Sequence, residues 1–376
     1  MRSTSYLQSL SLVLIAGLPV AGLLAAPQAQ ADTLAVYPEQ VVLSHERDPE
    51  RLVVVRTRDD GVTLDVTHEA VLQFAQEGLA RWGEDYRLYP QADGETALTV
   101  THGDLTATLT VTVANAGVVP PRSFRNDVLP ALMAGGCNGG GCHGSAQGKN
   151  GFHLSLFGYD PPSDYLSLTR EMRGRRMNPA LPEASLMLQK PLGEVPHEGG
   201  TVMEKGDPVY EALYHWIAEG AKDDDVANLP TLTGIELLPG EAVLDGADAQ
   251  QRFKVRATYS DGTDRDVTDT AILSTSDELT LTVDKTGRAT AGQPGEVYVM
   301  ARYGTFAVVS QAIVLPAGKT LAWPEDAQPQ NFIDEFIFTK LRKLRVAPAP
   351  RCSDPVFVRR AYLDVLGVLP TVEETE

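Results

Sequence analysis

Two stretches of the chain alternate apolar and polar residues with a period of two, which is the pattern of half-buried β-strands. In each stretch, two such runs lie on either side of an Asp-Gly pair, a strong signal for a hairpin. These segments read RLVVVRTRDDGVTLDVT at 51–67 and RFKVRATYSDGTDRDVT at 252–268. A second hairpin follows in each, around Gly103 and Gly304. The pattern predicts two small β-sandwiches, over residues 34–116 and 232–316.

The two predicted sandwiches are copies of one unit, because their sequences align at a constant offset of 201 residues. Three blocks share this register without a gap. VYPEQVVL at 36–43 aligns with LLPGEAVL at 237–244, DGVTLDVTHEAVL at 60–72 with DGTDRDVTDTAIL at 261–273, and GETALTVTHG at 94–103 with GEVYVMARYG at 295–304. We therefore expect a small β-sandwich from each copy.

The segment between the sandwiches has apolar residues at helical spacing instead. One stripe ends at Gly135, and a second follows the N-cap candidate Asp207 and Pro208. The stripes are Phe124, Val128, Leu129, Leu132 and Met133, then Val209, Leu213, Trp216 and Ile217. We predict a mainly α domain over 123–222.

The end of the chain carries two further helical patterns, over 332–344 and 354–367. Thr371 and Glu374 then stand three apart, which is a capping box for another helix. We interpret residues 330–376 as the N-terminal part of a truncated helical domain. Cys352 lies in this segment as a lone thiol.

The chain begins with the features of a secretory leader. Arg2 is followed by an apolar run and by the small-x-small sequence Ala29-Gln30-Ala31. We predict a signal peptide over 1–31 and no transmembrane segment in the mature chain. The protein is then exported to the periplasm, the cell surface or the medium.

The net charge of −18 argues against two classes of binding partner. Lys and Arg carry binding to nucleic acids and to anionic membranes, so an acidic chain argues against both. The chain also has no G-x-S-x-G motif, and its acidic residues fall in turns and caps. These features give no support for a hydrolase.

The sequence GGCNGGGCHG at 135–144 holds two of the three cysteines beside a histidine. Covalent attachment of haem needs two thiols and a histidine directly after the second, normally as C-x-x-C-H. Here Cys137, Cys142 and His143 give C-x4-C-H, and we expect Gly139–Gly141 to take positive φ angles that let the two extra residues bulge. A Cys137–Cys142 disulfide and a zinc site remain alternatives.

This segment resembles the planctomycete-type cytochrome c domain in its C-x4-C-H form. The resemblance rests on LMAGGCNGGGCHGSAQGKNGFHLSLFGYDP, RRMNPALPEASLMLQKPLGEVPHEGG and YEALYHWIAEGA, in that order. It implies that Cys137 and Cys142 attach haem c by thioethers and that His143 binds its iron. The sandwiches resemble bacterial Ig-like domains of the invasin and intimin type, and the tail resembles the uncharacterised domain that follows such modules in large planctomycete surface proteins.

The second axial iron ligand is sought in a loop before the last helix of the domain. His197, in VPHEGG, is the first candidate, with Met203 and Met177 as alternatives. Arg170, Arg173, Arg175 and Arg176 form a basic cluster that either faces solvent or pairs with the propionates of haem.

The expected fold is multidomain: two all-β Ig-like sandwiches flanking a mainly α cytochrome c-like domain, with a truncated helical C-terminus. The expected function is one-electron transfer by an exported c-type cytochrome with an unknown redox partner, its Ig-like modules serving as spacers or contacting a cell surface or polysaccharide. Two alternatives remain: a redox-silent surface-binding or structural protein with a Cys137–Cys142 disulfide, and peroxidase-like catalysis at haem. The sequence of residues 1–376 is more typical of an electron-transfer protein than of an enzyme.

Overall fold

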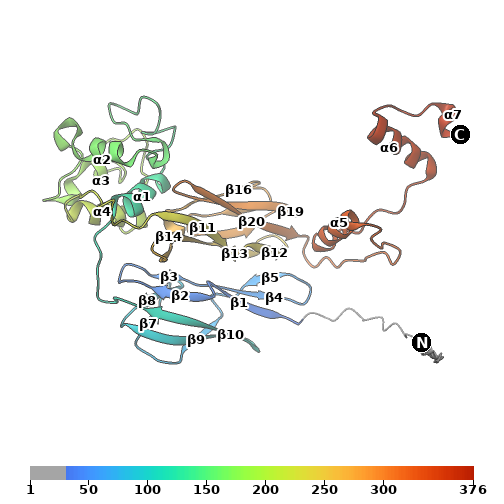
Figure 1. The fold of residues 1–376 in the computed structure, drawn as a ribbon, viewed down its shortest axis with the longest axis horizontal. Coiled ribbons are helices and arrows are strands. Elements are labelled where there is room, and N and C mark those ends of the chain that lie inside the picture. Colours follow the sequence, from blue (N-terminus) through green and yellow to red (C-terminus); the bar gives the residue numbers. More distant parts are fainter. Residues whose placement is uncertain (1–30) are drawn as a thin grey trace, which may run out of the picture.

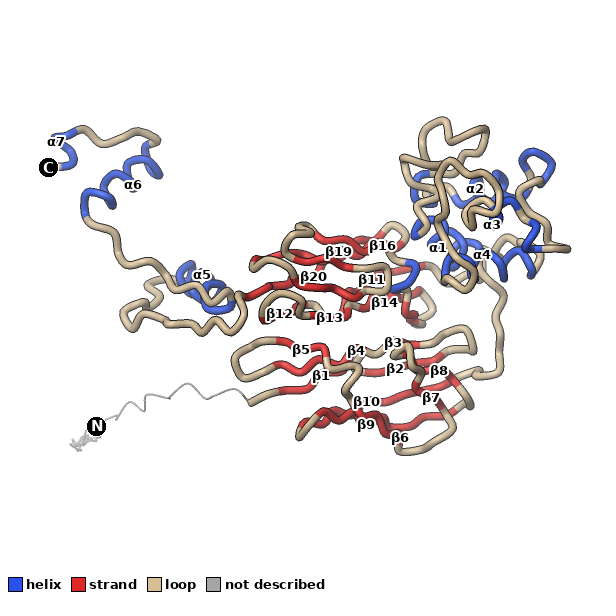
Figure 2. Tube along the Cα trace, turned by 180° about the vertical axis from the view of Figure 1, so that it is seen from behind, coloured by secondary structure: helices blue, strands red, loops and turns tan. Residues whose placement is uncertain are grey.

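The computed structural model describes residues 31–376, so the predicted leader lies outside the described residues except for Ala31. Two β-sandwiches lie side by side in the middle of the molecule (Figure 1). A domain of short helices lies at one end, and the last three helices extend from the other (Figure 2). The central domain therefore interrupts the repeat in sequence, but the two copies are neighbours in space.

The first sandwich contains strands β1 to β10 in three sheets. Their orders are β1-β4-β5, β2-β10-β9-β6 and β3-β8-β7, and β2 is parallel to β10. The strands are β1 Thr33–Tyr37, β2 Gln40–Leu43, β3 Glu50–Arg51, β4 Val53–Thr57, β5 Thr63–Asp65, β6 Val71–Phe74, β7 Ala80–Trp82, β8 Arg87–Pro90, β9 Gly94–His102 and β10 Leu105–Val113.

The second sandwich repeats this topology strand for strand. Its sheets are β11-β14-β15, β12-β20-β19-β16 and β13-β18-β17, and β12 is parallel to β20. The strands are β11 Leu232–Leu238, β12 Glu241–Asp245, β13 Gln250–Arg252, β14 Lys254–Tyr259, β15 Asp264–Asp266, β16 Ile272–Thr275, β17 Leu281–Val283, β18 Arg288–Ala291, β19 Gly295–Tyr303 and β20 Phe306–Leu315. The two copies of the 201-residue repeat therefore share one strand order.

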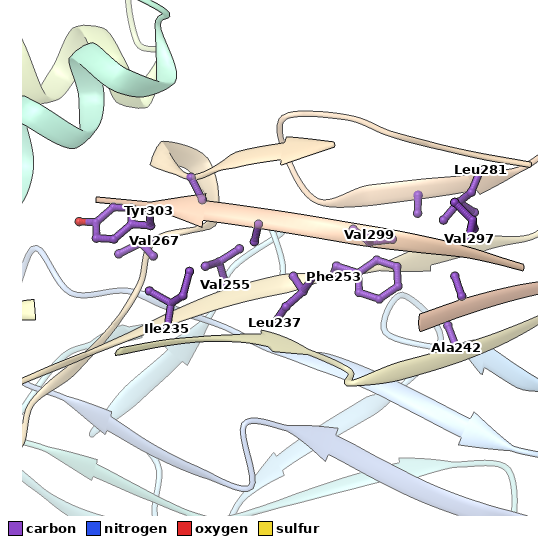
Figure 3. Packing of buried hydrophobic residues seen from close by; sticks show 14 of the residues in the cluster. Ile235, Leu237, Ala242, Phe253, Val255, Val267, Leu281, Val297, Val299 and Tyr303 are labelled. Carbon is purple, nitrogen blue, oxygen red and sulfur yellow. The ribbon is translucent and has the colours of Figure 1, made fainter. Parts of the chain in front are cut away.

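The period-two pattern places alternate side chains in the core of each sandwich. In β19, Val297 and Val299 are fully buried, whereas Tyr298 and Met300 between them are 42% and 40% exposed. The buried side chains pack with Phe253 and their neighbours between the sheets (Figure 3). Each fully buried residue of this size contributes about 1.5–3 kcal/mol relative to an exposed one.

The two sandwiches share a buried interface formed by β5 of the first and β12 and β13 of the second. Val62 packs there against Val243, Ile313 and Leu315 in one apolar cluster. The Thr63 hydroxyl donates to the Val243 carbonyl at 3.1 Å and accepts from its N–H at 2.9 Å. These contacts join the copies as one packed body.

Charged side chains are also buried where the two sandwiches meet. Lys254 is fully buried and pairs with Glu50, which is 3% exposed. Arg51 pairs with Asp269 at 2.7 Å and with Asp266 at 3.4 Å. Burial lowers the pKa of Lys254 to about 8, although the nearby carboxylates oppose the shift. Each charge depends on a partner from the other copy, because an unpaired buried charge is costly.

The central domain differs from the sequence-based expectation. Its α-helices have only 6, 9, 4 and 11 residues, and turns and loops form most of the rest. They are α1 Leu129–Ala134, α2 Pro161–Thr169, α3 Leu186–Gln189 and α4 Pro208–Ala218, with short helical turns η1 Phe124–Val128, η2 Leu156–Gly158, η3 Glu171–Gly174 and η4 Pro182–Ala184. One further turn, η5 Thr268–Thr270, belongs to the second sandwich.

The predicted fold class, with a mainly α cytochrome c-like domain at its centre, is therefore wrong. The described chain is dominated by its twenty strands. The physical reason is that prolines and glycines divide residues 135–207 into turns, so the helical stripes at the ends of the segment do not extend through it. The expectation that residues 123–222 form a cytochrome c domain is therefore wrong as well.

The tail has the predicted helices. These are α5 Phe332–Lys343, α6 Asp354–Leu366 and α7 Val372–Thr375, and the capping box between Thr371 and Glu374 forms. Phe336 of α5 and Val365 of α6 are 73% and 80% exposed. Within residues 31–376, no helix has the length and apolar character that a membrane span requires.

Candidate functional site

A cavity of about 560 Å³ lies in the central domain. Helices α1, α3 and α4 supply apolar wall residues, among them Leu132, Met187 and Leu213. The cavity is also lined by five of the six residues singled out in the sequence as haem ligands or alternatives: Cys137, Cys142, His143, His197 and Met203. The fold thus brings together positions that are up to 66 residues apart.

The two cysteines lie on a tight loop that starts where α1 ends. The Cys137 N–H donates to the Leu132 carbonyl at 2.8 Å, and the His143 N–H donates to the Cys137 carbonyl at 3.0 Å. Gly136 supplies the positive φ, at 70°. Gly139–Gly141 do not have positive φ angles, so the expected reason for these three glycines is wrong. The loop is instead closed by backbone turns.

The glycine that this loop requires most is Gly144. A Cβ atom there would lie 2.0 Å from the Asn138 carbonyl oxygen, whereas one at Gly141 would meet nothing within 4 Å. We expect Gly144→Ala to destabilise the central domain by about 1–3 kcal/mol, as overpacking does. Gly141→Ala is the matched control, with an expected change within about 0.5 kcal/mol. Thermal unfolding measures both, and equal effects would contradict the loop geometry.

Both thiols are free in the structure. Burial, with a smaller effect from neighbouring Cys142, raises the pKa of Cys137 to about 11. Cys137 is therefore a protonated thiol at neutral pH, and Cys142 opens onto the same cavity. The predicted disulfide alternative is not formed in this state.

The His143 imidazole is oriented by one backbone group. Its Nδ1 lies 3.1 Å from the Phe152 carbonyl oxygen. A carbonyl only accepts, so Nδ1 carries the hydrogen and the neutral ring keeps a lone pair on Nε2. Burial lowers the pKa of His143, which favours this neutral form.

The His197 imidazole is held in the same way in this cavity. Its Nδ1 lies 2.9 Å from the Gly200 carbonyl oxygen, which again leaves the Nε2 lone pair free. The rings of His143 and His197 are 6.5 Å apart between centroids and within 13° of parallel. The two imidazoles therefore lie close together in one cavity.

The two methionine alternatives differ in position. Met203 is 2% exposed and lines the cavity. Met177 packs against the core of the domain and is not among the cavity residues. The structure keeps Met203 as an alternative to His197 and gives Met177 a packing role.

Side chains alone do not make a metal centre in the described part of the chain. Residues 31–376 contain no group of three or more His, Cys, Asp or Glu side chains placed to hold a metal ion. The zinc alternative, which needs at least three such ligands, is therefore wrong, and the expectation of an iron-binding protein gains no support from the side chains of these residues. The cavity offers two imidazoles, so a metal held between them must bring its remaining ligands with it.

Sequence reasoning missed three residues of the site. Phe152 orients His143 through its backbone carbonyl, which no side-chain pattern reveals. Lys149 and Lys190 also line the cavity. Their spacing from the histidines in the sequence carries no signal, because turns decide where they point.

One family model matches the chain, over residues 332–376 only. It is described as "PSCyt2: Protein of unknown function (DUF1549)". The match falls on helices α5 to α7, outside the cavity domain. The chain matches no curated protein.

Among solved structures, the chain is similar to surface layer protein SbsC and to titin domains z1z2 in complex with telethonin. SbsC domains 1–6 are 12% identical, with 78% of this chain and 29% of that chain covered and a TM-score of 0.22. SbsC domains 5–6 are 11% identical, with 75% and 97% covered and a TM-score of 0.28, and titin domains z1z2 in complex with telethonin are 11% identical, with 78% and 99% covered and a TM-score of 0.16. Similarity at this level does not establish a shared function, and this chain spans about 29% of the first of these structures.

Proposed function

We propose that this chain is an exported modular protein in which two packed sandwiches present a ligand-binding cavity at or outside the cell surface. The leader-like sequence at 1–31 supports export. The sandwiches share a buried interface in which Lys254 pairs with Glu50, and this packing favours a rigid base for the cavity domain. Such a body suits a surface-binding or structural role whatever the cavity holds.

We infer further that the cavity binds haem through two thioether bonds. The observation that carries this is a pair of nearly parallel imidazoles, each hydrogen-bonded through Nδ1, that lines the same cavity as two free thiols. The proposal rests on this chemistry and not on a cytochrome fold. A volume of about 560 Å³ is within the usual range for pockets that bury a sizeable ligand.

The residues of the chain have distinct roles in this proposal. Cys137 and Cys142 would hold the ligand through thioether bonds, for which each S–H would add across one vinyl group, with sulfur on one carbon and hydrogen on the other, so that no oxidant is needed. His143 and His197 would hold its iron. Bound haem supplies one-electron chemistry.

The two histidines also decide between electron transfer and catalysis. If both bind iron, no axial position stays open, which favours electron transfer over the peroxidase-like alternative. The cavity walls around them are largely apolar, with Leu132, Leu154 and Leu213. Exclusion of water by such walls is one of the ways in which proteins tune a haem.

We expect His197→Ala to convert a low-spin ferric haem into a high-spin one, because a strong axial ligand is lost. Absorption spectra of the purified chain measure this, with Met203→Ala as the matched control. The wild type should lack the weak near-infrared band of sulfur ligation. A wild-type band that disappears only in Met203→Ala would assign the role to Met203, and a high-spin wild type would favour the peroxidase-like alternative.

A further inference from the structure

The cavity is positively charged in an acidic protein. Lys149, Arg175, Arg176 and Lys190 line it, against one carboxylate, that of Glu198. The whole chain has the opposite balance, with 32 Lys and Arg against 50 Asp and Glu. The four cations, which we call the cationic rim, are therefore concentrated around the cavity.

Two members of the cationic rim are fixed beside the two histidines. The Arg176 guanidinium lies 4.2 Å from the centroid of the Phe152 ring and donates to the Ser167 carbonyl at 2.6 Å. Phe152 is the residue whose carbonyl orients His143. The Lys190 ammonium donates to the carbonyl of Pro196, next to His197, at 3.0 Å.

The other two members are exposed and free to pair with a ligand. Lys149 and Arg175 form no ion pair with any carboxylate of residues 31–376. Arg175 follows an unusual turn, in which Met172, Arg173 and Gly174 all have positive φ angles of 50°, 59° and 68°. Two consecutive non-glycine residues in this region are strained, and such strain is typical of functional sites. The turn brings the chain back to the cavity, where Met172 and Arg175 line it.

We propose that the cationic rim binds the carboxylate groups of the cavity ligand, with Lys149 and Arg175 as the contacts that pair with them. This inference rests on the proposed function, because haem carries two propionates. It goes beyond that function by assigning the carboxylates to named residues. Charge-assisted hydrogen bonds to a carboxylate, bidentate from arginine, are the strong kind.

The test compares haem with its dimethyl ester, which has the same ring but no carboxylates. The full chain, made without haem-attachment machinery, is titrated with each compound in the same detergent-containing buffer, and binding is followed by absorption. We expect the wild type to bind the acid at least about tenfold more tightly than the ester, since each such contact contributes more than a factor of ten. High salt should reduce this difference.

The variant Lys149→Gln/Arg175→Gln should lose the preference for the acid and bind the ester as the wild type does. Arg173→Gln is the matched control, because Arg173 is an exposed neighbour that does not line the cavity. Equal binding of acid and ester by the wild type would overturn this inference alone. Loss of ester binding in the double variant would also overturn it, and absence of binding of either compound would overturn the proposed function together with it.

Discussion

Replacing both Cys137 and Cys142 with serine is expected to abolish covalent retention of haem, and either single replacement to leave one thioether and weaken it. The reason is that both thiols line one cavity beside His143 and are free to react. The measurement is a haem stain after denaturing electrophoresis of the chain made with haem-attachment machinery. We expect no stained band for the double variant.

Cys352→Ser is the matched control for this result. Cys352 is exposed on the segment before α6, outside the cavity, and its loss should leave the stain unchanged. A double variant that kept its haem through denaturation would contradict thioether attachment. Spectra under native conditions then show whether the histidines still hold haem without the covalent bonds.

Lys254→Met is expected to destabilise the paired sandwiches by about 3–5 kcal/mol, because it leaves Glu50 buried without its partner. For a body of this size, that is a fall of at least about 6 °C in the melting temperature. Adding Glu50→Leu should recover most of the loss, since a buried ion pair replaced by apolar residues is often neutral. Calorimetry of the full chain measures all three proteins.

Lys285→Met serves as the control for the buried pair. Lys285 forms an ion pair with Asp207 at 3.3 Å, but its side chain is 77% exposed. The expected cost is under about 1 kcal/mol, because solvent screens the pair. A Lys254→Met variant as stable as this control would mean that the sandwiches do not dock through these charges.

Much of the fold can be predicted from the pattern of apolar and polar residues along the chain. Alternation in β19 gives the burial of Val297 and Val299 directly, and the constant offset gives the second copy the strand order of the first. The docking of the copies does not follow, because Glu50 and Lys254 are 204 residues apart and resemble surface charges on strands. Only the packing of the two sandwiches shows that they are buried.

The candidate site was predictable where residues are adjacent in sequence. The C-x4-C-H motif contains Cys137, Cys142 and His143 and indicates haem attachment. His197 could be predicted as a second iron ligand from its position in a loop before the last helix of the domain. The mainly α prediction failed because turns, not helices, hold these residues in place. The role of Gly139–Gly141 was misjudged because the backbone conformation of a closed loop depends on hydrogen bonds that composition does not specify.

The attachment of haem is tested most directly on a single peptide. Trypsin releases residues 126–149, which contain Cys137, Cys142 and His143 and no internal Lys or Arg. For the wild-type chain made with haem-attachment machinery, mass spectrometry should find this peptide carrying one haem, with both cysteines blocked to alkylation. A peptide without haem, either freely alkylated or closed by a Cys137–Cys142 disulfide, would contradict the account.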